Sequence, residues 1–196
     1  MKKVDTKMIQ QLREETGAGI MDAKQALEES QGDLAKAILI MKKKGQKIAA
    51  QKKSRTANEG VVGYYVHANN KIGAQVALAC ETDFVAKTDD FKDLAHDIAM
   101  HITAADPQYL SAEDVPRDIV AKEEEIYLAQ VKQEKKPDKI GDQIVKGKLK
   151  NFYSETCLLS QPFVKDDSKS IQELIQENVL KLGENIRINS FKRLSL

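Results

Sequence analysis

Residues 60–80 read GVVGYYVHANNKIGAQVALAC, and this stretch decides the fold class of the chain. Its first part is mostly β-branched or aromatic, which favours an extended strand. Ala68-Asn69-Asn70 is typical of a turn. From Ile72 to Cys80 every second residue belongs to one apolar set, as in a strand with one buried face. The stretch therefore predicts an antiparallel β-hairpin.

On the C-terminal side of this hairpin the apolar spacing changes to that of helices. Residues 116–153 predict two charged helices, broken at Lys135-Lys136-Pro137, with thin apolar seams. Thin seams on paired helices favour an antiparallel helical hairpin that projects from the body. Before it, we expect one helix with a single apolar stripe formed by Phe91, Leu94, Ala95, Ile98 and Ile102.

The last part of the chain returns to strands. Residues 156–164 predict a strand, and Pro162 places it at a sheet edge or a strand end. A helix is expected over residues 170–183, between a Ser-x-x-Glu capping box and a glycine. Residues 185–196 alternate at first and are expected to close the sheet. Because this order lacks βαβ regularity, the predicted fold class is α+β with an antiparallel sheet.

The segment before the hairpin predicts a small helical bundle over residues 1–45. Asp5 can cap its first helix, and residues 16–19 and 32–33 separate the three short helices. Gly45 is expected to end the third helix. Helices this short bury little surface, so the bundle should have marginal stability of its own.

A basic stretch over residues 46–58 is expected to be a solvated helical linker between this bundle and a core domain over residues 59–196. Between Leu34 and Asn58 there is no acidic residue. Such a basic window also allows a competing interpretation, the binding of nucleic-acid phosphates. The net charge of +1 and the lack of aromatic residues among the lysines argue against direct nucleic-acid binding.

Signatures of catalysis are missing. The sequence has no phosphate-binding G-x-x-x-x-G-K-[ST] loop, no dinucleotide-binding G-x-G-x-x-G after a strand, and no G-x-S-x-G. His96 and His101 are five residues apart, which does not stack them on one helical face, so no metal site is expected. Cys80 and Cys157 lie in apolar, strand-like runs and are expected to be buried, reduced thiols. We expect a binding protein that is not an enzyme and uses no cofactor.

The termini and the apolar runs bear on location. No apolar run approaches the roughly 18 residues that a membrane helix needs. The N-terminus becomes polar at once, so no signal peptide is expected. We therefore expect a cytoplasmic protein without a membrane partner.

Two segments carry a resemblance: residues 16–24 (TGAGIMDAK) and 80–86 (CETDFVA). Together with residues 161–164 (QPFV) and 181–186 (KLGENI), they are similar to the elongation factor Ts family, and the similarity extends over essentially the whole chain. The resemblance implies that the N-terminal bundle is ubiquitin-associated-like. It also implies a partner, the GTPase elongation factor Tu bound to GDP, and a function, guanine-nucleotide exchange during translation.

The resemblance implies a role for the turn after residue 81. The Asp83-Phe84 pair would enter the GTPase domain of the partner and dislocate its Mg²⁺, whose octahedral oxygen geometry tolerates little distortion. The residues themselves leave two alternatives open: Phe84 can pack as a staple on its own helix, and Asp83 can be a simple helix N-cap. The residues assigned to the partner here are Thr82, Asp83, Phe84 and Val85.

Two further partner contacts follow from the resemblance. Ile20, Met21 and Lys24 match the face of the bundle that grips the GTPase domain, although a ubiquitin-type ligand is an alternative for the bundle. Leu182 and Gly183 match a contact on the phosphate side of the partner, where isoleucine is common in place of Leu182.

The number of core copies bears on assembly. Long members of the family carry a duplicated core, whereas this chain carries one and resembles the short form. The short form completes itself as a symmetric homodimer. A single sheet with open edges supports the same expectation, because unpaired edges must be covered.

Overall fold

The computed structural model describes residues 4–133 and 138–196, and within them the fold is α+β, as predicted. Three N-terminal helices form a bundle: α1 (Thr6–Thr16), α2 (Ile20–Glu29) and α3 (Leu34–Lys52). The Asp5 side chain caps α1 by accepting a hydrogen bond from the Met8 N–H at 2.8 Å. Gly17 ends α1 with a φ of 65°, a left-handed conformation that favours glycine. The buried core of the bundle is formed by Leu12, Ala18, Ala23, Ala26, Leu27, Ala37 and Met41.

The prediction that Gly45 ends the third helix is wrong, because α3 continues unbroken to Lys52. Gly45 is buried against α8 (Ile171–Leu182), where a β-carbon would meet the backbone oxygen of Gln176 at 3.6 Å. Ile48 and Ala49 are partly buried against the main core. The first half of the expected solvated linker is therefore a packed helix, and glycine serves here as a small contact residue.

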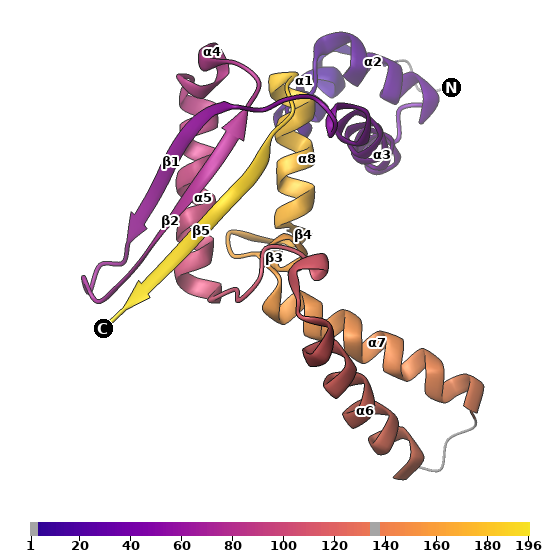
Figure 1. Cartoon of the computed structure of the whole chain (residues 1–196). Helices are drawn as coiled ribbons and strands as arrows, with labels where there is room; N and C mark the ends of the chain where they lie inside the picture. The colour runs from indigo at the N-terminus through magenta and orange to yellow at the C-terminus, as the bar shows by residue number, and fades with distance from the viewer. Residues whose placement is uncertain (1–3, 134–137) are drawn as a thin grey trace.

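The predicted hairpin is confirmed as β1 (Glu59–Val66) and β2 (Ile72–Cys80), which pair antiparallel. The last strand, β5 (Arg187–Ser195), pairs antiparallel with β2, which gives a three-stranded sheet of order β1-β2-β5. Figure 1 shows this sheet with α5 (Asp89–Ala105) lying along one face. The predicted apolar stripe of α5 is buried there, and Gly63 allows the close approach, since a β-carbon would lie 2.7 Å from Ala95.

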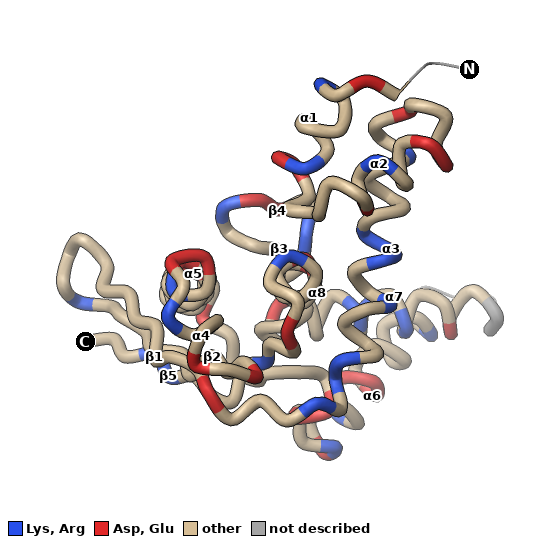
Figure 2. Tube along the Cα trace, turned by 90° about the horizontal axis from the view of Figure 1, so that it is seen from above, with Lys and Arg blue, Asp and Glu red and all other residues tan. Residues whose placement is uncertain are grey.

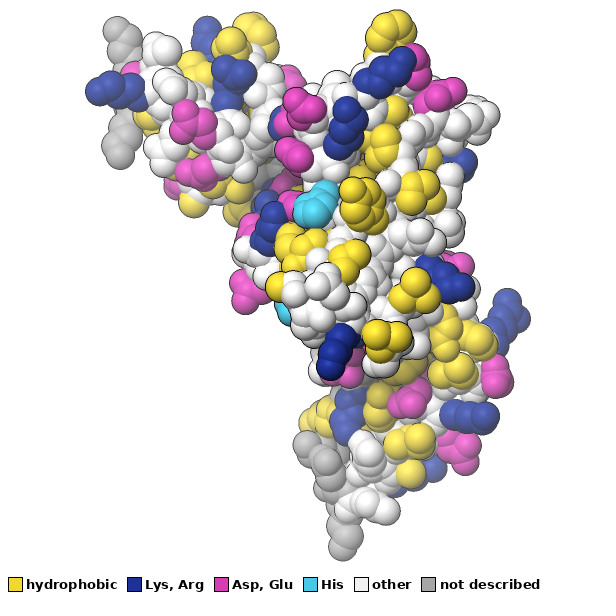
Figure 3. Space-filling model, turned by 90° about the vertical axis from the view of Figure 1, so that its left-hand side faces the viewer, with side chains coloured by type: hydrophobic (Ala, Val, Ile, Leu, Met, Phe, Trp, Pro, Cys, Tyr) yellow, Lys and Arg dark blue, Asp and Glu magenta, His cyan; other side chains and the backbone are white. Residues whose placement is uncertain are grey.

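The opposite face of the sheet lacks a covering helix among the described residues. Val62, Tyr64 and Val66 of β1 and Leu194 of β5 are exposed there, with Tyr64 at 71%. We call these four residues the outer sheet face. Figure 3 views the molecule from the side of β1 and shows hydrophobic side chains gathered over this part of the surface. Exposed apolar side chains that share one face of a sheet are typical of an interface.

The predicted helical hairpin is confirmed as α6 (Arg117–Gln133) and α7 (Asp138–Thr156), which pack together and project from the body (Figure 1). Val131 and Val145 are buried between them. A short 3₁₀ helix, η1 (Ala112–Asp114), with its capping box, precedes the hairpin. The predicted break at residues 135–137 lies outside the described residues.

The strand predicted over residues 156–164 is wrong in most of its length. Helix α7 continues to Thr156, Cys157 forms an isolated bridge with Tyr109, a 3₁₀ helix η2 (Leu158–Ser160) follows, and β3 (Pro162–Phe163) is the part that forms a strand. It pairs with β4 (Asp166–Ser170) in a separate two-stranded sheet, with proline at the strand end, as predicted. The apolar side chains of residues 156–164 are buried although the segment bends. The periodicity of a sequence does not distinguish such a segment from a buried strand. Both cysteines are buried, as predicted, and burial raises the pKa of each thiol.

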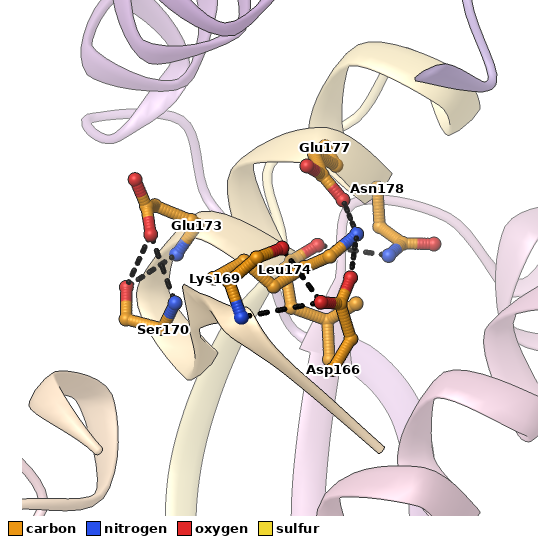
Figure 4. Close-up of polar contacts among 8 residues, drawn as sticks. Asp166, Lys169, Ser170, Glu173, Leu174, Glu177 and Asn178 are labelled. Carbon is orange, nitrogen blue, oxygen red and sulfur yellow. Dashed lines mark hydrogen bonds and ion pairs between the residues drawn. The ribbon is translucent and has the colours of Figure 1, made fainter. Parts of the chain in front are cut away.

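Helix α8 connects the two cores of the molecule. Ile171, Ile175 and Val179 belong to the main core, while Leu180 packs against the bundle core. The predicted capping box and the glycine stop are confirmed, since Gly183 has a φ of 76°. Figure 4 shows the box, with Ser170 and Glu173 bonded to one another at the start of α8.

A partly buried ion pair holds the β3–β4 hairpin against α8. The Lys169 ammonium lies between Glu177, at 2.8 Å, and Asp166, at 3.4 Å (Figure 4). Burial acts to lower the pKa of Lys169, but the hydrogen bonds and charges of the two carboxylates outweigh it, so the pKa is raised. Lys169 therefore stays charged and fixes the hairpin.

His101 of α5 is the buried polar residue that connects α5 to this hairpin. Its Nε2 lies 2.9 Å from the Gln161 side-chain oxygen, and its Nδ1 accepts a hydrogen bond from the Val164 N–H at 3.3 Å. A ring nitrogen that accepts carries no proton, so the imidazole is neutral. Burial lowers the pKa of His101, although the bond to Gln161 opposes this.

We predict that His101 makes the fold sensitive to acid. Because its pKa is lowered in the folded state, its contribution is complete above the ordinary value of 6.5 and is lost as the pH falls below it. This group alone should reduce the free energy of unfolding by at most about 1.4 kcal/mol per pH unit. Urea denaturation across this range should show a shallower pH dependence for His101→Gln. The exposed His96→Gln variant serves as the control, and equal slopes for wild type and His101→Gln would contradict the prediction.

Candidate partner-binding site

The four-residue helix α4 (Asp83–Ala86) begins directly after β2 and presents Phe84 to solvent. The Thr82 hydroxyl caps this helix by accepting from the Val85 N–H at 3.4 Å. Ala86 is buried and Val85 packs against the main core, whereas the Phe84 side chain is 80% exposed. The alternative that Phe84 packs as a staple on its own helix is therefore wrong.

Asp83 is the first residue of α4, and the N-cap is Thr82, so the interpretation of Asp83 as a simple N-cap is also wrong. Its carboxylate pairs with the Lys87 ammonium at 2.6 Å. The hydrogen bond from Lys87 lowers the pKa of Asp83, and the same contact raises the pKa of Lys87. Asp83 is thus ionised and paired with Lys87 within the turn that carries Phe84.

The bundle residues assigned from the sequence lie in the first turns of α2. Ile20 and Met21 are 56% and 74% exposed, so both apolar side chains face solvent. Lys24 is exposed one turn further along, with its ammonium 3.8 Å from the Glu28 carboxylate. Two exposed apolar side chains with a cation beside them form a small contact surface on the bundle.

The two residues assigned at the end of α8 differ from one another. Leu182 is half-buried and packs against the main core, so its side chain serves chiefly the fold. Gly183 is exposed, and its carbonyl oxygen accepts a hydrogen bond from the Lys52 ammonium at the end of α3. Only the backbone of this glycine is presented at the surface.

The assigned residues of the α4 turn, of α2 and of the C-terminal end of α8 lie at one end of the molecule, where contacts between distant segments hold them. Gly17, just before α2, lies against the Lys181 side chain, since a β-carbon there would be 3.2 Å from its Cδ. The Lys181 ammonium in turn pairs with Asp90 of α5 at 2.7 Å. Figure 1 shows α4, α2 and the C-terminal end of α8 at this same end. The sequence-assigned residues therefore share one side of the structure.

Comparison with known proteins gives the family of the chain. Residues 2–196 match the model of one protein family, described as Elongation factor TS. The chain belongs to the elongation factor Ts family. It is similar to elongation factor Ts of Coprothermobacter proteolyticus, with 49% identity over 99% of this chain and 98% of the relative. It is also similar to elongation factor Ts of an Anaeromyxobacter species, strain K, with 51% identity over 100% of this chain and 90% of the relative.

Basic residues of the window between Leu34 and Asn58 form ion pairs with acidic residues elsewhere in this member of the elongation factor Ts family. Figure 2 shows Lys and Arg along α3. Lys44 pairs with Asp22 of α2 at 2.8 Å, and Arg55 pairs with Glu81 at 3.6 Å. Part of the positive charge is therefore used in holding α3 and the following segment to the rest of the chain. Within residues 4–133 and 138–196, no helix has the length and apolar character needed to cross a membrane.

Sequence reasoning missed Glu81 and Glu184, although both belong to segments that carry the resemblance to elongation factor Ts. Their side chains join the α4 turn to the segment after α8. One signal was available in the sequence. Glu184 follows Gly183 directly, and an acidic group beside the negative end of a helix is unfavourable unless it is bound elsewhere. Among the described residues, no group of three or more His, Cys, Asp and Glu side chains is placed to hold a metal ion.

Proposed function

We propose that this chain is a guanine-nucleotide exchange factor for elongation factor Tu. It binds the GDP form of that GTPase in the cytoplasm, dislocates the bound Mg²⁺, and so promotes release of GDP and loading of GTP. It makes no covalent change and needs no cofactor. The observation that carries the proposal is the exposed Phe84 ring on a turn that is capped and held from both sides.

The free energy of inserting one aromatic ring fits this role. Complete burial of a phenylalanine side chain in a partner contributes about 1.5–3 kcal/mol. That is enough to offset a small displacement of a helix or loop in the GTPase. Mg²⁺ requires near-ideal octahedral geometry, so a small shift of its ligands weakens nucleotide binding. Asp83 can exchange its ion pair with Lys87 for a hydrogen bond from a backbone N–H that the displacement sets free.

The remaining contacts give the exchange factor its affinity. Ile20 and Met21 supply apolar area on the bundle, Lys24 supplies a charge, and the Gly183 backbone lies at the end of α8. Because these groups share one end of the molecule with Phe84, a single partner can contact all of them. If the factor weakens GDP binding, GDP must weaken factor binding equally, so the complex with both is transient.

We propose further that the chain acts as a homodimer that buries the outer sheet face. Val62, Tyr64, Val66 and Leu194 present apolar side chains on a single uncovered surface. A two-fold pairing of two such sheets gives each copy the second layer that a sheet with one covered face lacks.

Phe84→Ala should reduce the rate of GDP release from elongation factor Tu by about tenfold or more, because about 1.5–3 kcal/mol of ring burial is lost. The release of a fluorescent GDP analogue in the presence of Mg²⁺ measures this rate. Thermal stability should be unchanged, since the ring makes little contact with its own chain. The matched control is Val164→Ala, which shortens an exposed apolar side chain on the β3–β4 hairpin. An unaltered release rate for Phe84→Ala would refute the insertion.

Sedimentation equilibrium should give a mass near twice 21.9 kDa for the wild-type chain. Tyr64→Glu should convert it to a monomer, because a charge placed in an apolar interface loses its hydration without gaining a partner. Val164→Glu, which adds the same charge at an exposed position away from the sheet, should leave the mass unchanged. A monomeric wild-type chain that still accelerates GDP release would remove the homodimer from the proposal.

A further inference from the structure

The Glu184 carboxylate is the centre of the contacts that hold the α4 turn. One oxygen accepts hydrogen bonds from two successive backbone N–H groups, those of Glu81 and Thr82, each at 3.0 Å. The other oxygen accepts from the Thr82 hydroxyl at 2.6 Å. Both oxygens are thus bonded to the two residues before α4, more than a hundred positions away in the sequence.

A second carboxylate binds in the opposite direction. Glu81 accepts a hydrogen bond from the Asn185 N–H at 2.7 Å, and the Arg55 guanidinium lies 3.6 Å from the same oxygen. The Asn185 side chain donates to the Arg55 carbonyl at 2.8 Å. We call the paired contacts of Glu81 and Glu184 the reciprocal clamp. It joins the α4 turn, the segment after α8 and the segment after α3.

The turn needs such a clamp because it cannot hold its own shape. Helix α4 has only a few backbone hydrogen bonds of its own, such as those from the Ala86 and Lys87 N–H groups to the Thr82 and Asp83 carbonyls, and isolated helices of this length do not form in water. The Phe84 ring contributes little, since it faces solvent. The direction of that ring therefore depends on Val85 and Ala86, which pack inward, and on the bonds that fix Glu81 and Thr82 in front of the helix.

We propose that Glu184 is the positioning residue of the exchange reaction. Its carboxylate holds the Thr82–Val85 turn so that Phe84 is presented in a single orientation, and it makes this turn and Gly183 move as one unit. The inference rests on the proposed exchange function. It adds to that function a residue that orients the inserted ring through another segment of the chain.

The chemistry of the carboxylate makes the role testable with a small change. Glu184→Gln preserves length and shape, but it replaces one acceptor oxygen with an NH₂ group that can only donate. In the variant the remaining oxygen can face the two N–H groups while the NH₂ group donates to the Thr82 hydroxyl oxygen, so the substitution removes the negative charge that strengthens these bonds and keeps their geometry. Glu155→Gln, an exposed position near the end of α7, is the matched control.

Hydrogen exchange of the full-length chain tests the clamp without any partner. Glu184→Gln should increase the exchange rates of the Glu81 and Thr82 amides about tenfold, as expected when charge-assisted hydrogen bonds are replaced by neutral ones. The Glu155→Gln control should leave them unchanged. Unchanged protection of both amides in Glu184→Gln would overturn the inference.

A double-mutant cycle with Phe84 tests the role in exchange. Glu184→Gln should reduce the maximal rate of GDP release from elongation factor Tu about tenfold, which corresponds to about 1.4 kcal/mol. In the Phe84→Ala background the same change should have little further effect, because no ring remains to be oriented. Equal effects in both backgrounds would show a role independent of Phe84 and overturn the inference.

The same experiments distinguish a failure of the inference from a failure of the proposed function. A wild-type chain that does not accelerate GDP release would overturn the exchange function and the positioning role together. A wild-type chain that does so, beside a Glu184→Gln variant of equal maximal rate, would overturn only the role of Glu184.

Discussion

The burial of α5 against the three-stranded sheet is the contact on which the rest of the structure depends. Gly63 lets the helix approach the sheet closely, and the stripe from Phe91 to Ile102 fills the space between them. One helix covers only one face of a sheet, so the outer sheet face stays open. The short connection from β2 to α5 must also turn back at the strand end, and this reversal places α4 and Phe84 at the surface.

The elements that could be predicted from the sequence are those whose pattern is set by local burial. The hairpin over residues 60–80 and the stripe of α5 each have one buried face, and their periods of two and 3.6 are readable. The predictions for Gly45 and for residues 156–164 are wrong because contacts with distant segments determine the local structure there. Gly45 is a helix interior position only because α8 packs there, and residues 156–164 bend to bury side chains against α5 and α8.

The candidate site also contains features that local sequence predicts and features that contacts between distant segments determine. Phe84, Ile20 and Met21 are exposed, as a contact with a partner requires, although helical spacing alone groups Ile20 with the buried residues of α2. The position of Glu184 after a helix end indicates a bound carboxylate, but its partners in the reciprocal clamp could not be predicted, because they are backbone N–H groups of a distant segment. Leu182 was assigned to a partner, yet its side chain is largely committed to the core.

The unbroken course of α3 has a mechanical consequence. A helix of 19 residues is about 28 Å long and resists bending far more than a loop of equal length. Its first half belongs to the bundle and its second half packs on α8, so the bundle cannot swivel on a hinge at Gly45. The distance between the exposed surface of the bundle and the Phe84 ring is therefore fixed by the fold. A partner that contacts both surfaces, as proposed, must present two binding regions at that separation.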